Sequence, residues 1–189
     1  MIVASGVANS SMANYSRHLF IKITMVSAFL ALVLGCGYAF APQGENIDKS
    51  IQKIYVEQFA NKTAQVEIEN YVRQAFINQF IQNSRFRITD SVESADATVR
   101  GGVINLSTTP LSYRSNILVA EERATLTLEI TFRETQSSKI IWSSRNITGF
   151  VDYTIDNNIN LLPATRMTAF TKLAADIAEK TFNQMMSGF

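Results

Sequence analysis

Cys36 is the only cysteine of the 189-residue chain, and His18 is its only histidine. A thiol can be acylated or act as a nucleophile, and an imidazole can act as a general base or bind a metal. Cys36 follows Gly35 directly, at the end of the longest uncharged apolar run of the sequence, residues 23–34. The thiol therefore lies where a leader peptide would end.

Residues 1–35 are typical of a secretory signal peptide. Arg17 and Lys22 precede the apolar run, and the segment contains no acidic residue. A basic region, a short apolar region and a small residue at the cut site define such signals. Twelve residues would rise only about 18 Å as a helix, too little to cross a hydrocarbon core of about 30 Å. Translation from Met12 would give a signal peptide of more ordinary length.

The sequence Val33-Leu-Gly-Cys36 resembles a bacterial lipobox, in which the cysteine is acylated and becomes the first residue after cleavage. Valine in place of the commoner leucine is a mild departure. We predict that Cys36 carries diacylglycerol and an N-acyl chain such as palmitate, because several acyl chains anchor a protein stably. Gly37, rather than aspartate, predicts sorting to the outer membrane, and residues 36–49 would then form a lipidated tether. The alternatives are an ordinary signal that ends at a lone cysteine, or a buried thiol.

Removal of residues 1–35 would leave a chain without histidine. Ser-His-Asp and Cys-His catalysis would then be impossible, and a zinc site would consist of carboxylates alone. Glycine motifs for phosphates or dinucleotides are absent from the sequence. Two of the 17 Lys and Arg residues lie in the leader, so 15 remain against 16 Asp and Glu, and no basic excess indicates nucleic-acid binding. We expect no enzyme activity, no metal and no cofactor beyond the lipid on Cys36; a carboxylate-based hydrolase is a distant alternative.

The chain after the tether is long enough for one domain, which we place at residues 50–187. Apolar residues recur with helical spacing at residues 64–83 and 165–186. Asn61 or Thr63 would cap the first of these helices.

The clearest strand is residues 124–133, where apolar side chains alternate with Thr, Glu and Arg. Further strands are expected at 50–59, 85–89, 97–108 and 140–149, with a bulge or bend at Gly101-Gly102, a connection at 109–119 and irregular structure at 150–163. This order (β-α-β-β-β-β-α) predicts an α+β fold, with a mostly antiparallel sheet of four to five strands and two amphipathic helices on one face.

Several motifs accompany these elements. They are a strand that ends in Phe59-Ala-Asn-Lys-Thr63, Ala95-Asp-Ala97 before a strand, Thr109-Pro-Leu-Ser-Tyr113, a strand with Ile141-Trp142 and a closing amphipathic helix. Together with the lipobox, this order resembles the LptE family of lipopolysaccharide-assembly lipoproteins across residues 36–186. The segment 109–113 is the most distinctive part of the resemblance.

The resemblance implies a non-catalytic lipoprotein anchored on the periplasmic side of the outer membrane. Such a protein plugs the LptD β-barrel, helps that barrel to assemble and assists lipopolysaccharide transport to the cell surface. The polar face of residues 125–131 could meet a polar barrel lumen.

Contact with lipopolysaccharide requires cations for phosphates and apolar surface for acyl chains. The candidate lipopolysaccharide or barrel contacts are Leu111, Tyr113, Arg114 and Arg123. Solvated or ion-paired surface residues are the alternative for the two arginines, and packing within a loop is the alternative for the two apolar residues.

A different class of protein also has a strand that ends in Phe-x-Asn-x-Thr before a helix. In that alternative, the chain is a periplasmic lipoprotein that regulates a penicillin-binding protein, a peptidoglycan synthase. Such regulators usually have a long linker after the lipid. Here about 14 residues, at most about 50 Å of extended chain, separate Cys36 from the first predicted strand, which favours a domain that works at the membrane.

Overall fold

The computed structural model describes residue 22, residues 47–115 and residues 118–188. Cys36, the predicted signal peptide apart from residue 22, and most of the predicted tether lie outside the described residues. From residue 47 onward the elements are β1 (Lys53–Val56), β2 (Ala60–Asn61), α2 (Ile68–Gln82), β3 (Arg87–Ile88), β4 (Ala97–Ser115), β5 (Leu118–Glu134), β6 (Ile140–Thr154), a 3-10 turn η1 (Ile159–Leu161) and α3 (Leu162–Ser187).

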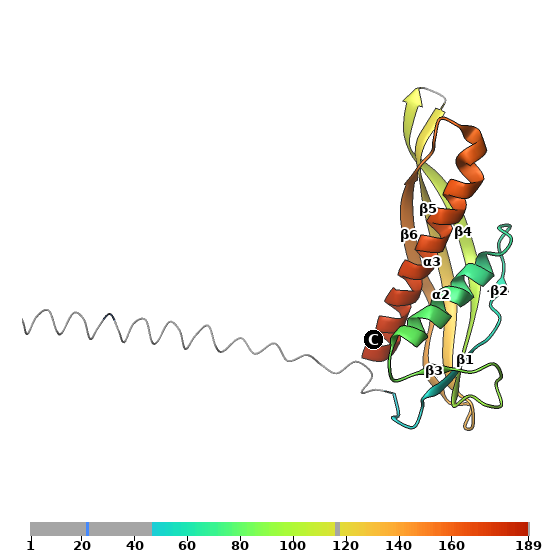
Figure 1. The fold of residues 1–189 in the computed structure, drawn as a ribbon, viewed down its shortest axis with the longest axis vertical. Coiled ribbons are helices and arrows are strands. Elements are labelled where there is room, and N and C mark those ends of the chain that lie inside the picture. Colours follow the sequence, from blue (N-terminus) through green and yellow to red (C-terminus); the bar gives the residue numbers. More distant parts are fainter. Residues whose placement is uncertain (1–21, 23–46, 116–117, 189) are drawn as a thin grey trace, which may run out of the picture. The chain divides into compact units, whose positions relative to one another are not determined.

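The strands form one sheet in the order β3-β1-β4-β5-β6, and β2 also pairs with β4. The three long strands β4, β5 and β6 are antiparallel to one another. The short strand β1 runs parallel to both of its neighbours, β3 and β4. Helices α2 and α3 lie on one face of this sheet (Figure 1). The predicted α+β fold with a mostly antiparallel sheet and two helices is confirmed.

The alternation in β5 places one set of side chains in the core. Leu126, Leu128 and Phe132 are fully buried beneath the helices, whereas Thr127 and Thr131 lie half-buried on the opposite face. We call this opposite face, which the helices do not cover, the open face of the sheet. An antiparallel sheet with one packed face and one wet face produces this sequence pattern.

Aromatic rings join the two helices to the sheet. The ring of Phe80 on α2 lies 5.2 Å from Phe182 on α3, 5.5 Å from Phe86 and 6.2 Å from Phe132 on β5, measured between centroids. Edge-to-face and tilted arrangements at these separations are favourable beyond the burial of apolar area. This cluster is the centre of the core.

The start of α2 differs from the prediction. The helix begins at Ile68, and its N-cap residue is Glu67, with a left-handed φ of 68° and no side-chain cap. The predicted caps are wrong because Asn61 belongs to β2, whose two residues pair with β4. The Asn61 side chain instead accepts hydrogen bonds from the amide and hydroxyl of Thr63 and donates one to Glu69, so it holds the loop before the helix.

The long strands also run further than predicted. The predicted connection at 109–119 is wrong, because Thr109 pairs with Arg123 and Tyr113 pairs with Val119 in the β4–β5 hairpin. The irregular structure predicted from residue 150 is wrong up to residue 154, because residues 150–154 pair with β5. The causes differ: in residues 109–119 strand pairing compensates for poor strand formers such as Pro110 and Ser112, whereas residues 150–154 are mostly aromatic or β-branched and continue β6.

Gly101 allows close packing against β4 and does not mark a bend in the strand. The register of β4 against β5 continues through Gly101 and Gly102, and the shift predicted there occurs instead between Val103 and Asn105. A Cβ atom on Gly101 would lie 2.5 Å from the Phe59 ring and 2.6 Å from Ile130 Cδ1. Only glycine allows the Phe59 ring to approach β4 this closely.

Candidate functional site

The structure brings the predicted contact residues to one end of the sheet. Leu111, Tyr113 and Arg114 lie on the last part of β4, and Arg123 lies on the first part of β5. We call this region the distal end. It comprises the described residues of the hairpin within 109–125, residues 150–161 and the first two turns of α3. Figure 1 shows the end of the hairpin at the top, beside the start of α3.

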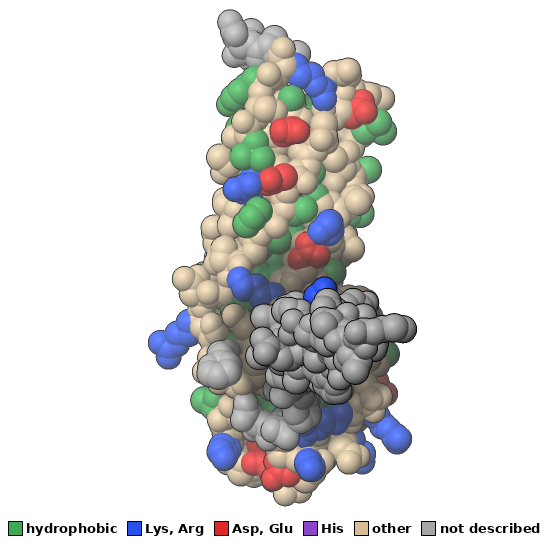
Figure 2. Space-filling model, turned by 90° about the vertical axis from the view of Figure 1, so that its left-hand side faces the viewer, with side chains coloured by type: hydrophobic (Ala, Val, Ile, Leu, Met, Phe, Trp, Pro, Cys, Tyr) green, Lys and Arg blue, Asp and Glu red, His purple; other side chains and the backbone are tan. Residues whose placement is uncertain are grey.

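Apolar side chains are exposed at the distal end. Tyr113 is 58% exposed and Leu111 is 44% exposed, so neither is packed inside a loop. Phe150, Ile159 and Leu161 of the same region are also exposed. In the upper part of the side of the molecule shown in Figure 2, hydrophobic side chains lie between acidic and basic ones. A surface that combines exposed apolar groups with charges is typical of an interaction site.

Arg123 is held by two neighbours on the open face. Its Nε and Nη2 atoms donate to the two carboxylate oxygens of Asp152, at 2.7 and 2.8 Å. Its guanidinium also lies 4.2 Å from the centroid of the Phe150 ring. The hydrogen bond to Asp152 raises the pKa of Arg123, and the same bond lowers the pKa of Asp152. Arg123 is therefore an ion-paired surface residue, the alternative considered for it.

Arg114 also has partners within the chain. Its guanidinium donates hydrogen bonds to the carbonyl oxygen of Ile155 and to the side-chain oxygen of Asn157. These contacts tie the end of β4 to the segment that follows β6. Both predicted arginines thus organise the distal end, and their role as contact residues stays a prediction, as it does for Leu111 and Tyr113.

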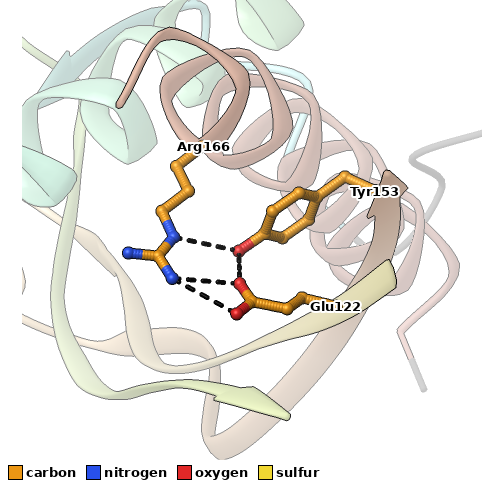
Figure 3. Close-up of polar contacts among 3 residues, drawn as sticks. All are labelled: Glu122, Tyr153 and Arg166. Carbon is orange, nitrogen blue, oxygen red and sulfur yellow. Dashed lines mark hydrogen bonds and ion pairs between the residues drawn. The ribbon is translucent and has the colours of Figure 1, made fainter. Parts of the chain in front are cut away.

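A buried polar cluster lies on the helix side of the same region, and the sequence analysis missed it. Glu122 of β5 and Tyr153 of β6 are 8% and 9% exposed, and Arg166 comes from the second turn of α3 (Figure 3). The Tyr153 hydroxyl donates to Glu122. Arg166 donates from Nη2 to Glu122 at 3.1 Å and from Nε to the Tyr153 oxygen at 3.3 Å.

The cluster holds one charge of each sign, which allows it to be buried. Burial, and then the hydrogen bond to Glu122, raise the pKa of Tyr153, so its hydroxyl stays a donor at neutral pH. Burial lowers the pKa of Arg166, but hydrogen bonds to Tyr153 and Glu122 outweigh that effect and the net shift is upward. The Tyr153 hydroxyl and the Glu122 carboxylate are buried, and Arg166 hydrogen-bonds to both of them, so the evident role of the cluster is to fasten the start of α3 to the sheet.

One signal in the sequence could have revealed this cluster. Glu122 has the same phase in the β5 alternation as Ala124 and Leu126, so a strand that begins before residue 124 places a carboxylate on the buried face. A buried carboxylate requires a partner.

Two further observations concern the described residues only. Residues 47–115 and 118–188 contain no group of three or more His, Cys, Asp or Glu side chains placed to hold a metal ion. None of the helices described is both long and apolar enough to span a membrane.

Comparison with known proteins identifies one family and several similar folds. The family model described as LptE, lipopolysaccharide-assembly, matches residues 51–185. Lipoprotein B from Nitrosomonas europaea has a similar fold, with a TM-score of 0.52 at 10% sequence identity over 80% of this chain and 92% of that one. A lipoprotein from Caulobacter crescentus gives a TM-score of 0.49 at 10% identity over 74% and 90% of the two chains. A search of curated proteins gave no match.

Proposed function

Because this chain belongs to the LptE family of lipopolysaccharide-assembly proteins, we propose that it is a non-catalytic outer-membrane lipoprotein. In this proposal it plugs an LptD-type β-barrel, helps that barrel to assemble and assists the transport of lipopolysaccharide to the cell surface. The family match over residues 51–185 carries the proposal, because it spans nearly the whole folded domain.

The two faces of the sheet suit a plug. Thr125, Thr127 and Thr131 lie half-buried on the open face, and the hydroxyls of Thr127 and Thr148 lie 3.3 Å apart across β5 and β6. The lumen of a large membrane barrel is polar, and a hydroxyl-rich surface can meet it without leaving charges unpaired. We propose that the open face contacts the barrel lumen.

The distal end suits an amphipathic ligand. Leu111 and Tyr113 offer exposed apolar surface, and Arg114 and Arg123 lie close to them in the same hairpin. Acyl chains require the first kind of group, and phosphates require the second. We propose that this end contacts lipopolysaccharide or the barrel.

The anchor belongs to the same proposal. Acylation of Cys36 would hold the domain at the periplasmic side of the outer membrane and raise its effective concentration near the barrel. Metabolic labelling with a palmitate analogue tests this directly, since Cys36→Ala should abolish the label. Label retained by that variant would refute the anchor.

Affinity purification from detergent-solubilised outer membranes tests the partner. Recovery of a large β-barrel protein with the tagged chain is the expected result. Recovery of a penicillin-binding protein in its place would refute the proposal and support the alternative, a regulator of peptidoglycan synthesis.

Depletion of the protein from cells tests its proposed role in barrel assembly and lipopolysaccharide transport. The proposal predicts misassembled barrel and lipopolysaccharide retained at the inner membrane or in the periplasm, as measured by surface labelling of lipopolysaccharide. Normal surface lipopolysaccharide after depletion would contradict the proposal.

A further inference from the structure

The outer edge of β6 is open to a further strand. β6 is the last strand of the sheet, so only β5 pairs with it in the described part of the chain. The amide of Ile155 donates to the carbonyl of Ala120 on β5. Backbone groups alternate in direction along an antiparallel strand, so the odd-numbered residues from 149 to 155 face β5 and the even-numbered ones face outward.

One part of this edge is protected and the next part is not. Lys180 of α3 donates to the outward carbonyl of Thr148 at 3.0 Å. A lysine placed on an edge strand is a common protection against pairing with another chain. Further along, the outward backbone groups of Phe150, Asp152 and Thr154 have no hydrogen-bond partner among residues 47–115 and 118–188. We call residues 150–154 the free edge.

A hollow of about 500 Å³ lies beside the free edge. Val151, Asp152 and Tyr153 form its β6 side. Its other side consists of mostly small or apolar residues at and before the start of α3, namely Leu161, Ala164, Thr165, Thr168, Ala169 and Lys172. A strand edge next to such a groove suits an extended peptide, which pairs with the edge through its main chain and places alternate side chains in the groove.

The backbone groups of the free edge favour a peptide over a lipid. An acyl chain could occupy the hollow, but it would cover the outward amides and carbonyls without satisfying them, which costs free energy. An added strand satisfies them. Its side chains would alternate between the hollow and the open face, where the side chains of Phe150 and Asp152 are exposed.

A second copy of β6 fits this edge poorly. Antiparallel pairing centred on the free edge would place Asp152 of one copy opposite Asp152 of the other, and like charges directly opposite each other are destabilising. A register shifted toward the start of β6 would meet Thr148, whose outward carbonyl already accepts from Lys180.

The segment of this chain before residue 47 also fits poorly. Arg85, which precedes β3, donates to the carbonyl of Ile47, so Ile47 lies near the end of the sheet where β6 begins. From Ile140 to Asp152, β6 rises about 40 Å. Residues 36–46 span at most about 40 Å when extended, so none of them would remain to lie along the free edge.

We propose that the free edge of β6 takes an extended segment of the barrel protein as an additional strand. This inference rests on the proposed function and deepens it, because it commits one part of the distal end to the barrel. Strands of membrane barrels alternate apolar and polar side chains, as the hollow and the open face require. The added strand would also extend the open face, which is proposed to contact the barrel lumen.

Photo-crosslinking in cells tests the inference on the full-length, acylated chain. Benzoylphenylalanine in place of Thr168, in the wall of the hollow, should crosslink to the barrel protein. Mass spectrometry should locate the crosslink in a segment with apolar residues at alternate positions. A crosslink to a second copy of this chain would overturn the inference.

Proline at position 154 tests the main-chain pairing. Thr154→Pro removes an outward amide and leaves the bonds to β5 intact, because edge strands tolerate proline where the amide faces outward. The crosslink yield should fall about tenfold, the effect expected for the loss of one good hydrogen bond. Thr154→Ala keeps the amide and is the matched control, with the yield of the unaltered chain.

A tryptophan in the hollow provides a second test that leaves the strand unchanged. Ala164 is exposed and lines the hollow, so Ala164→Trp should block the added strand and lower the crosslink yield. Ala175→Trp is the control, because Ala175 is exposed on the same helix outside the hollow. An unchanged yield in both Thr154→Pro and Ala164→Trp would overturn the inference.

The outcomes also separate this inference from the proposed function. If the barrel copurifies but is not crosslinked from position 168, the inference about the free edge fails and the proposed function stands. If no barrel is recovered and position 168 crosslinks to a penicillin-binding protein, the proposed function fails and the assignment of the free edge to the barrel fails with it.

Discussion

The aromatic core and the distal end belong to the same sheet and are held in different ways. Around Phe80, rings from both helices and β5 meet, and Phe80 and Phe132 have no exposed surface. At the distal end, an ion pair, a cation–π contact and the buried Glu122 cluster add to the packing of smaller apolar residues such as Ala124 and Val151. There, large apolar side chains such as Tyr113 are exposed to solvent.

This difference between the two regions suggests that the aromatic core provides most of the stability and that the distal end is available for binding. Burial of apolar surface is the dominant favourable contribution to folding, and it is concentrated around the aromatic cluster. Polar contacts contribute less net free energy but specify geometry. We therefore expect substitutions in the aromatic core to unfold the domain, and substitutions at the distal end to change what the domain binds.

The largest effect should come from Phe80→Ala. Removal of a fully buried ring leaves a cavity among Phe86, Phe132 and Phe182, and the expected loss is about 3–5 kcal/mol in the free energy of unfolding, measured with urea. Ile81→Ala, at an adjacent position that is 60% exposed, is the control and should cost at most about 0.5 kcal/mol. Equal losses in the two variants would remove the distinction between core and surface on α2.

The next effect should come from Glu122→Gln. It leaves Arg166 without its carboxylate partner, and because the Arg166 side chain is 38% exposed to solvent, the loss should be about 2 kcal/mol rather than the larger cost of a fully buried pair. A double-mutant cycle with Arg166→Met measures the coupling between the two residues. Additive losses would show that the cluster does not fasten α3 to the sheet.

A smaller effect should appear at alkaline pH. Because the folded state raises the pKa of Tyr153, this residue contributes stability that is fully present below the tyrosine pKa of the unfolded chain, about 10, and is lost as pH rises through the folded value. Urea unfolding between pH 8 and pH 11 should show this decline. In Tyr153→Phe, the free energy of unfolding should fall less steeply with pH over this range. An unchanged slope in that variant would show that other groups cause the decline.

The smallest effect on stability should come from the exposed residues Leu111 and Tyr113. Leu111→Ser and Tyr113→Ser should each change the free energy of unfolding by no more than about 0.5 kcal/mol. They should nevertheless reduce recovery of the barrel or of lipopolysaccharide in copurification. Full recovery with both variants would limit the binding role to other parts of the distal end.

The sequence predicts the elements whose pattern is local. The alternation of β5 around Leu126 and the apolar stripe of α3 around Leu173 are both periodic, and both elements are confirmed. The additional length of β4 could not be predicted from the sequence, because residues such as Pro110 and Ser112 are poor strand formers that only the long hairpin keeps extended. Parallel pairing of β1 is likewise a tertiary feature that no local pattern encodes.

The candidate site is harder to predict from the sequence than the fold is. The composition of the segment 109–113 directs attention to Leu111 and Tyr113, and their exposure agrees with a surface role. Glu122, Tyr153 and Arg166 come from three different elements, so their meeting depends on how α3 crosses the sheet.

The parallel pairing of β1 also constrains the order in which the chain can fold. Residues 97–154 form two successive hairpins, whose contacts close over short stretches of chain. β1 pairs only with strands that come later in the sequence, β3 and β4, and α2 intervenes before either is reached. Contacts between distant residues form slowly, because the loop entropy is lost first. The first strand of the domain in the sequence is therefore the one that must wait for its partners.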